Sequence, residues 1–267
     1  MTTVVDPQPP LFELSAVNRV YGRGAERVHA VRDVDLVVRD GERVGIVGES
    51  GSGKSTLVRM MAALDRPTSG TIRFRGRDIV GEPEKRLGDL RSSVQMVFQD
   101  PRSSLDPRMR IGETITEALR SPLLRQRGDV PVDRDARLRE VMTAVGLDPS
   151  LANGYPHEFS GGQRQRIAIA RALAPKPDVL IADEPVSALD VSVRAHVLNL
   201  LHELVAEYHL TMLFVSHDLT VVRHVCDRVI VMRSGEIVEQ GPIEQVYSDP
   251  QEPYTQQLLA AVPHIRL

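Results

Sequence analysis

Apolar and polar residues alternate in two stretches near the start of the chain. Residues 12–20 (FELSAVNRV) and 31–38 (VRDVDLVV) carry this pattern, which is typical of strands with one buried face. Residues 43–47 (RVGIV) form a short run of apolar and β-branched residues, and this run predicts a strand buried on both faces. Residues 70–80 predict a hairpin or a pair of edge strands around Gly76.

The pattern changes in the middle of the chain and then returns. Residues 110–147 lack strand runs and carry apolar residues at helical spacing, so we expect a helical insertion there. After it, strands and helices alternate, which indicates a mostly parallel sheet covered on both faces. The predicted elements are helices 161–173, 192–207 and 218–226 and strands 178–182, 211–215 and 228–232.

Composition bounds the possible functions. The 267 residues are 42% hydrophobic and 26% charged, as in an ordinary globular protein, and the net charge of -3 shows no basic excess of the kind that nucleic-acid binders carry. No apolar run is long enough to cross a bilayer, and residues 1–10 indicate a tail rather than a secretory leader. We therefore expect a cytosolic protein that meets a membrane only through a partner. Cys226 is the single cysteine, which excludes an internal disulfide and predicts a buried thiol.

A glycine-rich loop follows the predicted strand 43–47 and opens a helix. Residues 48–55 (GESGSGKS) match the phosphate-binding pattern G-x-x-x-x-G-K-[ST] in the context that this pattern requires. The backbone N–H groups can surround phosphates, Lys54 can reach the β- and γ-phosphates, and the Ser55 hydroxyl can ligate Mg²⁺. The alternative is a chance glycine-rich turn. The predicted nucleotide-binding residues are Gly48, Glu49, Ser50, Gly51, Ser52, Gly53, Lys54, Ser55 and Thr56.

Two carboxylates end the predicted strand 178–182. In the segment VLIADE, Asp183 stands where a Mg²⁺ ligand is needed, and Glu184 can polarise an attacking water as a general base. An ordinary acidic pair at a strand end is the alternative. The phosphate loop alone leaves kinases, helicases and motor ATPases open, but no N-K-x-D guanine reader is present.

A second helix start is suited to anions. In residues 159–163 (FSGGQ), Ser160 can cap the helix, while Gly161 and Gly162 expose its N-terminal N–H groups. The alternative is a simple helix cap. With these motifs together, the chain resembles the nucleotide-binding subunits of ABC transporters, whose signature is LSGGQ. Phe159 replaces the leading Leu and is expected to pack inward.

The resemblance covers almost the whole chain and implies a fold. The expected class is α/β, a P-loop NTPase (ABC-type) core with a mostly parallel sheet, an antiparallel β part at the N-terminal side and a helical subdomain insertion. One domain is expected, divided into a flexible start (1–11), a nucleotide-binding core (12–98 and 159–240), a helical subdomain (99–158) and a C-terminal extension (241–267).

The resemblance also assigns residues outside these motifs. Gln99 matches the glutamine that senses Mg²⁺ and the attacking water, so the implied metal-binding set is Ser55, Gln99 and Asp183. His217 in FVSHD matches the switch histidine at the γ-phosphate, and with Glu184 and Gln99 it completes the implied catalytic set. Alone, a histidine at a strand end is more often structural. Tyr21 stands where the family stacks an aromatic ring on adenine, with a packing tyrosine as the alternative.

In the family, two ATPase subunits face each other and share two ATP molecules. The resemblance therefore implies that Ser160, Gly161, Gly162 and Gln163 meet the nucleotide of a partner subunit, and that Asp190, in residues 187–190 (SALD), lies at the same contact. It implies ATP and Mg²⁺ as cofactors and two transmembrane permease subunits as partners, with an extracytoplasmic solute-binding protein further out. A homodimer and a heterodimer both remain open, and we favour a heterodimer.

Three further segments narrow the group. Residues 98–107 (FQDPRSSLDP), 155–162 (YPHEFSGG) and 252–263 (EPYTQQLLAAVP) resemble the ATPase subunits of bacterial peptide and nickel importers. For the last segment, a plain amphipathic helix is the alternative. The chain is thus expected to power import from the cytoplasmic face of the membrane, with residues 100–112 against a permease subunit. The alternatives are an ABC ATPase acting in DNA repair or translation, and a P-loop kinase, which would leave FSGGQ and VSHD unexplained.

Overall fold

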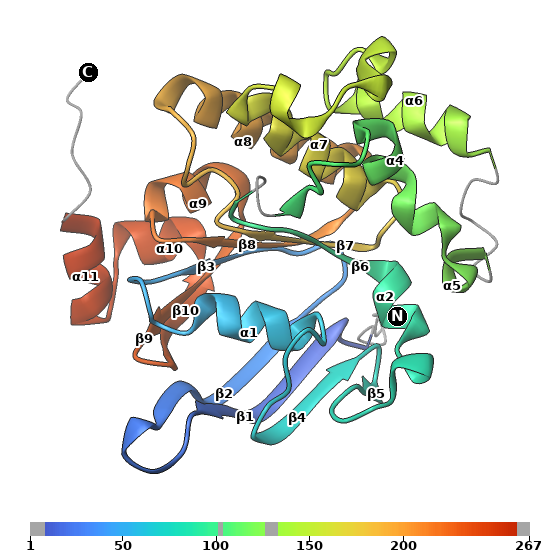
Figure 1. The fold of residues 1–267 in the computed structure, drawn as a ribbon. Helices are drawn as coiled ribbons and strands as arrows, with labels where there is room; N and C mark the ends of the chain where they lie inside the picture. Colours follow the sequence, from blue (N-terminus) through green and yellow to red (C-terminus); the bar gives the residue numbers. More distant parts are fainter. Residues whose placement is uncertain (1–8, 101–103, 126–132, 261–267) are drawn as a thin grey trace, which may run out of the picture.

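Two sheets organise the computed structural model, which describes residues 9–100, 104–125 and 133–260. Four strands form one sheet in the order β2-β1-β4-β5, and six form the other in the order β10-β9-β3-β8-β7-β6 (Figure 1). The strands are β1 Phe12–Tyr21, β2 Val28–Val38, β3 Arg43–Val47, β4 Ser69–Phe74, β5 Arg77–Asp78, β6 Val94–Val97, β7 Val179–Asp183, β8 Thr211–Ser216, β9 Arg228–Arg233 and β10 Glu236–Pro242. The helices are α1 Lys54–Met61, α2 Gly88–Ser93, α4 Ile111–Thr116, α5 Pro122–Arg125, α6 Arg134–Ala144, α7 Gly161–Leu173, α8 Val191–Glu207, α9 Leu219–Val225, α10 Ile243–Ser248 and α11 Pro253–Ala260, with short 3-10 turns between them.

The four-stranded sheet is antiparallel throughout, as predicted for the N-terminal side. Strand β1 pairs with β2 on one side and with β4 on the other, so that Phe12 lies opposite Val38 and Phe74. Strand β2 begins at Val28, three residues before the predicted start. Strands β4 and β5 pair antiparallel with each other and flank Gly76, which confirms the predicted hairpin.

The six-stranded sheet is mostly parallel, and its central strands are buried on both faces. Strands β9, β3, β8, β7 and β6 run parallel, and β10 is added antiparallel at one edge. In β7, Val179 and Ile181 point into one apolar cluster, while Leu180 and Ala182 point into another. A strand with cores on both sides needs continuous apolar residues, which explains the runs seen in the sequence.

The helices form layers on the two faces of this sheet (Figure 1). Helix α1 lies between the two sheets, and its Leu57, Val58 and Met61 are buried there. Helices α7, α8 and α9 cover the opposite face, and α4 and α6 pack on α7. The chain therefore has the P-loop α/β architecture that the sequence predicts, with a helical part attached through α7.

Strand β10 and helix α10 were not apparent from the hydrophobic pattern, whereas a helix at the position of α11 was one interpretation of residues 252–263. Strand β10 pairs with β9, and α10 and α11 follow it, with Val246 and Tyr254 buried in the same apolar cluster as α7. The boundaries proposed for the core, the helical subdomain and the extension remain predictions. Within the described residues, no helix combines the length and apolar character needed to cross a bilayer.

Candidate functional site

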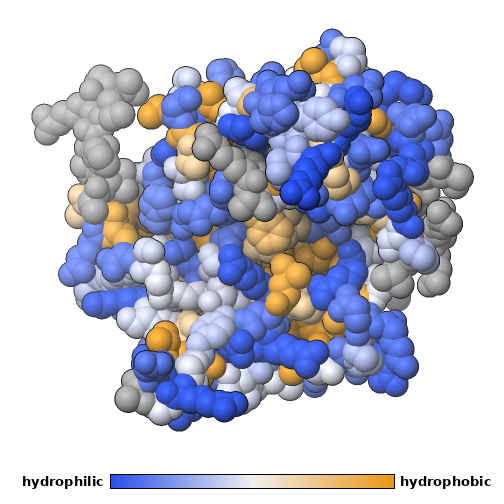
Figure 2. Space-filling view, viewed as in Figure 1, coloured by the Kyte–Doolittle hydropathy of each residue, from blue (hydrophilic) through white to orange (hydrophobic). Residues whose placement is uncertain are grey.

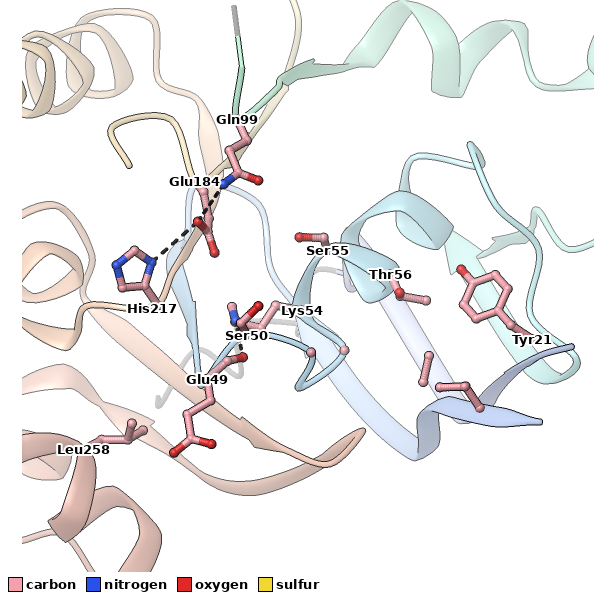
Figure 3. Close-up of a pocket in the computed structure, with 14 residues that line it drawn as sticks. Tyr21, Glu49, Ser50, Lys54, Ser55, Thr56, Gln99, Glu184, His217 and Leu258 are labelled. Atoms are coloured by element: carbon pink, nitrogen blue, oxygen red, sulfur yellow. Dashed lines mark hydrogen bonds and ion pairs between the residues drawn. The ribbon is translucent and has the colours of Figure 1, made fainter. Parts of the chain in front are cut away.

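A cavity of about 820 Å³ opens where β3, β7 and β8 end. Segments far apart in the sequence contribute to it, and Figure 3 shows Lys54 in the middle of the site, with Tyr21 and Leu258 on opposite sides. Such convergence is expected at the carboxyl ends of parallel strands, where ligands of α/β proteins bind. The lining residues are Tyr21, Val28, Ala30, Glu49, Ser50, Gly51, Gly53, Lys54, Ser55, Thr56, Gln99, Glu184, His217 and Leu258.

The phosphate loop has the backbone that its glycines permit. Gly53 adopts a φ of 101° just before α1, and a Cβ there would lie 2.3 Å from the carbonyl oxygen of Ala30. Only glycine fits such a position. The loop thereby reaches the N-terminus of α1 with its N–H groups available to an anion.

Lys54 is held inside this loop rather than extended into solvent. Its side chain is buried, at 4% exposure, and Nζ donates to the carbonyl oxygens of Gly48 and Glu49, both at 2.8 Å. Burial lowers the pKa of Lys54, and the opposing effect of nearby carboxylates, Glu184 first, is smaller. A buried cation is thus fixed at the loop, next to the space that a phosphate would fill.

Asp183 and Ser55 meet across the loop. The Ser55 hydroxyl donates to Asp183 Oδ1 at 2.7 Å, and Arg59 lies 3.9 Å from Oδ2. Burial raises the pKa of Asp183, although the Ser55 hydrogen bond and the charge of Arg59 oppose the rise. The Ser55 hydroxyl oxygen and the buried Asp183 carboxylate are oxygen ligands of the kind that Mg²⁺ prefers, so these side chains suit the predicted metal.

Glu184 lies between the other two predicted catalytic residues. Its Oε2 accepts from Gln99 Nε2 at 3.2 Å and is 3.5 Å from His217 Nδ1 (Figure 3). Glu184 also has a φ of 47°, which is uncommon for a residue other than glycine. The structure thus brings together Gln99, Glu184 and His217 from three separate segments, although their roles remain predictions.

Tyr21 lines the far end of the cavity, at the end of β1 (Figure 3). Its hydroxyl donates to Asp65, and the guanidinium of Arg19 lies over the ring, 4.2 Å from its centroid. Arg19 also pairs with Asp65 at 2.6 Å. The ring is therefore held by two neighbours, and Val28 and Ala30 of β2, which sequence reasoning missed, form the adjoining apolar wall.

The predicted signature residues lie outside this cavity. Ser160 caps α7, because its Oγ accepts from Gln163 N at 3.3 Å while Gln163 Oε1 accepts from Ser160 N at 2.9 Å. Asp190 caps α8 by accepting from the N–H of Val193 at 2.9 Å. The side chain of Val193 in turn lies so close to Gly162 that a Cβ there would be 2.5 Å from its Cγ1, so the starts of α7 and α8 are adjacent. Residues 160–163 and 190 thus gather at a second place, not around Lys54.

The segment expected to contact a permease is only partly described. Of the residues that the sequence favours for such a contact, Ser103 lies outside the described residues, and Leu105 is buried at 3% exposure. Leu105 therefore packs in the core and cannot be the partner-facing side chain. Nearby Leu64 and Phe98 are 53% and 37% exposed and line a hollow of about 220 Å³ together with Met96.

The surface view agrees with an apolar hollow on this side. Figure 2 shows apolar side chains gathered near the middle of a face that is otherwise mostly hydrophilic.

Two expectations about single residues are confirmed: Phe159 packs inward, and Cys226 is a buried free thiol. Burial raises the pKa of that thiol.

Comparisons with known proteins agree with this geometry. The ABC transporter family matches residues 31–187. The chain is 48% identical over 254 residues to the oligopeptide transport ATP-binding protein OppF of Salmonella typhimurium, covering 94% of this chain and 75% of that protein. It is 49% identical over 248 residues to the oligopeptide transport ATP-binding protein AppF of Bacillus subtilis, covering 92% and 74%.

Solved structures give the same result. A dimeric ATP-binding cassette in a post-hydrolysis state, bound to ADP and Pi, superposes with a TM-score of 0.75 at 33% identity, covering 87% of this chain and 98% of that one. The structure of cbiO1 from Clostridium perfringens, part of the ABC transporter complex cbiONQ, superposes with a TM-score of 0.78 at 29% identity, covering 90% and 91%.

Proposed function

The chain belongs to the ABC transporter family as an ATP-binding and ATP-hydrolysing subunit, and we propose that it powers the import of oligopeptides. The observation that carries the proposal is the cavity lined by Lys54, Ser55 and Glu184 beside Gln99 and His217, with Asp183 bonded to Ser55 at its edge. The substrate class is supported by the names of relatives that are 48% and 49% identical over more than nine-tenths of this chain.

In this proposal, the phosphate loop binds the nucleotide. Lys54 leaves part of its carbonyl bonding to meet the β- and γ-phosphates, and the N–H groups at the start of α1 complete the anion site. Tyr21 stacks on adenine. Ser55 and Asp183 would hold Mg²⁺, with Gln99 nearby, and the ion would neutralise charge on the β- and γ-phosphates.

Hydrolysis then depends on Glu184. A carboxylate beside the γ-phosphate can accept a proton from an attacking water. Gln99 donates to the same oxygen of Glu184 that faces His217, so both neighbours orient that carboxylate. His217 is exposed and is free to turn toward a γ-phosphate.

A single chain contains only part of the proposed site. Residues 160–163 and Asp190 lie away from Lys54, so in the proposal they meet the ATP of a second ATPase subunit. Two helix ends suited to anions are then used in one shared site, and ATP stabilises the closed dimer because it binds that state best. The partner is a second copy or a related ATPase.

Coupling to transport requires a permease. We assign the hollow of Leu64, Met96 and Phe98 to a short helix of a permease subunit, since the hollow adjoins Gln99 in the chain and combines exposed apolar side chains with Arg91 and Arg171. The ATPase would thereby lie at the cytoplasmic face of the membrane. Movement of Gln99 would link the permease to the nucleotide.

Reconstitution tests the proposal. The chain is purified with candidate permease and partner ATPase subunits and placed in vesicles that contain a candidate solute receptor. We expect peptide-dependent phosphate release and ATP-dependent peptide uptake. ATP hydrolysis with no membrane partner and no uptake would instead favour an ABC ATPase that is not coupled to transport.

A further inference from the structure

Helix α11 is fixed to the core at its start. The carboxylate of Glu239 in β10 accepts from the backbone N–H groups of Gln251 and Glu252, at 2.8 and 3.3 Å. Tyr254, the second residue of the helix, is buried at 4% exposure, and the guanidinium of Arg233 lies 4.9 Å from the centroid of its ring. The helix is thus held by strands β9 and β10, which belong to the same sheet as β3.

The buried hydroxyl of Tyr254 contacts the phosphate loop itself. The backbone N–H of Glu49 donates to Tyr254 Oη at 3.0 Å, and the carbonyl oxygen of Glu49 accepts from Lys54 Nζ at 2.8 Å. Glu49 is therefore held on one side by α11 and on the other by the buried lysine. Its N–H points to the protein, so it is not among the donors left for a phosphate.

A second residue of α11 reaches the nucleotide cavity. Leu258 lies one helical turn after Tyr254 and lines the cavity together with Glu49 and Ser50 (Figure 3). Its neighbour Leu259 is also partly buried but is not among the lining residues. The two contacts come from the same face of α11, as expected for positions i and i+4.

We propose that α11 is a working part of the nucleotide site, in which Tyr254 is a positioning residue for the phosphate loop and Leu258 is a wall of the cavity. The inference rests on the proposed ATP site and adds to it a contribution from outside residues 31–187. A loop that is already in the binding conformation loses less entropy when the ligand arrives. Release of α11 would therefore weaken nucleotide binding without removing any group that touches the phosphates.

Removing one oxygen atom tests the positioning role. Tyr254→Phe keeps the ring and leaves the Glu49 N–H without its acceptor. Because one hydrogen bond contributes about 0.5–1.5 kcal/mol net, we expect ATP to bind roughly 2- to 12-fold more weakly in a fluorescent-nucleotide titration of the full chain. Tyr247→Phe in α10 is the matched control, because Tyr247 packs against Arg223 and not against the loop. It should bind ATP like the wild type.

Hydrogen exchange gives a readout that needs no nucleotide. The Glu49 amide should exchange faster in Tyr254→Phe than in the wild type and should be unchanged in Tyr247→Phe. A purely structural role for Tyr254 would lower the melting temperature and leave both the ATP affinity and this amide unchanged, and that result overturns the proposal.

A second pair of variants covers the case in which Tyr254→Phe does not fold. Leu258→Ala should weaken ATP binding, whereas Leu259→Ala, which removes the same atoms from the same helix, should not. Equal effects of the two substitutions contradict the proposal. If the wild-type chain itself fails to bind ATP, the proposed function is wrong. If the wild type binds ATP but, within each pair, the variant and its control bind ATP equally well, only the role of α11 is wrong.

Discussion

Replacing Lys54 with alanine removes the buried cation from the phosphate loop. In the nucleotide-free chain, Nζ bonds to the carbonyl oxygens of Gly48 and Glu49, each at 2.8 Å. The substitution loses these two bonds but also removes a desolvated charge whose pKa is lowered by burial. Because the two effects oppose each other, we expect the melting temperature to change by only a few degrees, about 1 kcal/mol or less.

The effect on ATP binding should be much larger. A positive charge about 4 Å from one phosphate charge contributes roughly 4 kcal/mol at an effective dielectric constant near 20. Some of this is offset, because Lys54 must give up part of its bonding to Gly48 and Glu49 when ATP arrives. A remainder of about 3–4 kcal/mol corresponds to binding that is roughly 100- to 1,000-fold weaker.

A fluorescent-nucleotide titration measures this loss directly. Lys85→Ala is the control, since it removes the same side chain from an exposed position outside the cavity. Thermal unfolding without nucleotide shows that each variant is folded. Binding of ATP by Lys54→Ala within about threefold of the wild type would refute the assignment of the phosphate site.

Three further predictions concern other described residues. Asp183→Asn should stabilise the nucleotide-free chain at neutral pH, because burial raises the pKa of Asp183. Between the ordinary aspartate pKa and the raised value, the folded wild type binds more protons than the unfolded chain, so its stability falls as the pH rises through that window. Urea unfolding at several pH values should show a smaller fall in stability for the variant. An equal fall in the two proteins would contradict this prediction. Cys226 should react with iodoacetamide slowly in the native chain and rapidly in urea, since burial raises its pKa; rapid native labelling at pH 8 would count against a buried thiol. A cross-linker attached at Phe98→Cys, in a Cys226→Ala background, should capture a permease subunit in the assembled transporter, whereas Leu105→Cys, at a buried position, should not; the reverse pattern would exclude the proposed hollow.

Local sequence patterns predicted most of the fold. Strand 43–47 and helix 161–173 were predicted with the observed boundaries, because a continuous apolar run and a capped amphipathic stretch are local signals. The start of β2 was placed too late, at residue 31 instead of Val28, since its first three residues are exposed or half-buried and do not alternate clearly. Strand β10 was missed for the same reason: it has no buried residue at all.

The site divides in a similar way. The phosphate loop and the pair Asp183 and Glu184 follow from motifs whose spacing is local. The contact between Tyr254 and Glu49 does not, because it joins segments about 200 residues apart and depends on how β9 and β10 place α11. Leu258 was missed as a lining residue because a leucine in an amphipathic helix gives no signal of its own.

The shared site is the central claim, and one experiment tests it most directly. Glu184→Gln keeps the shape of the side chain but removes the proposed base, so Mg-ATP should bind without being hydrolysed and should hold two subunits together. Adding Ser160→Arg places a bulky side chain at the exposed signature turn, and it should abolish that dimer. Adding Ser150→Arg, the same change at an exposed position elsewhere in the helical part, should leave the dimer intact.

Light scattering with and without Mg-ATP reports the mass of each variant, first for the isolated chain and then for the assembled transporter, where a related ATPase can serve as the partner. The account predicts an ATP-dependent dimer for Glu184→Gln alone and with Ser150→Arg, and none with Ser160→Arg. Closure of the Ser160→Arg double variant as readily as that of Glu184→Gln, in the assembled transporter, would contradict a nucleotide site shared between two subunits.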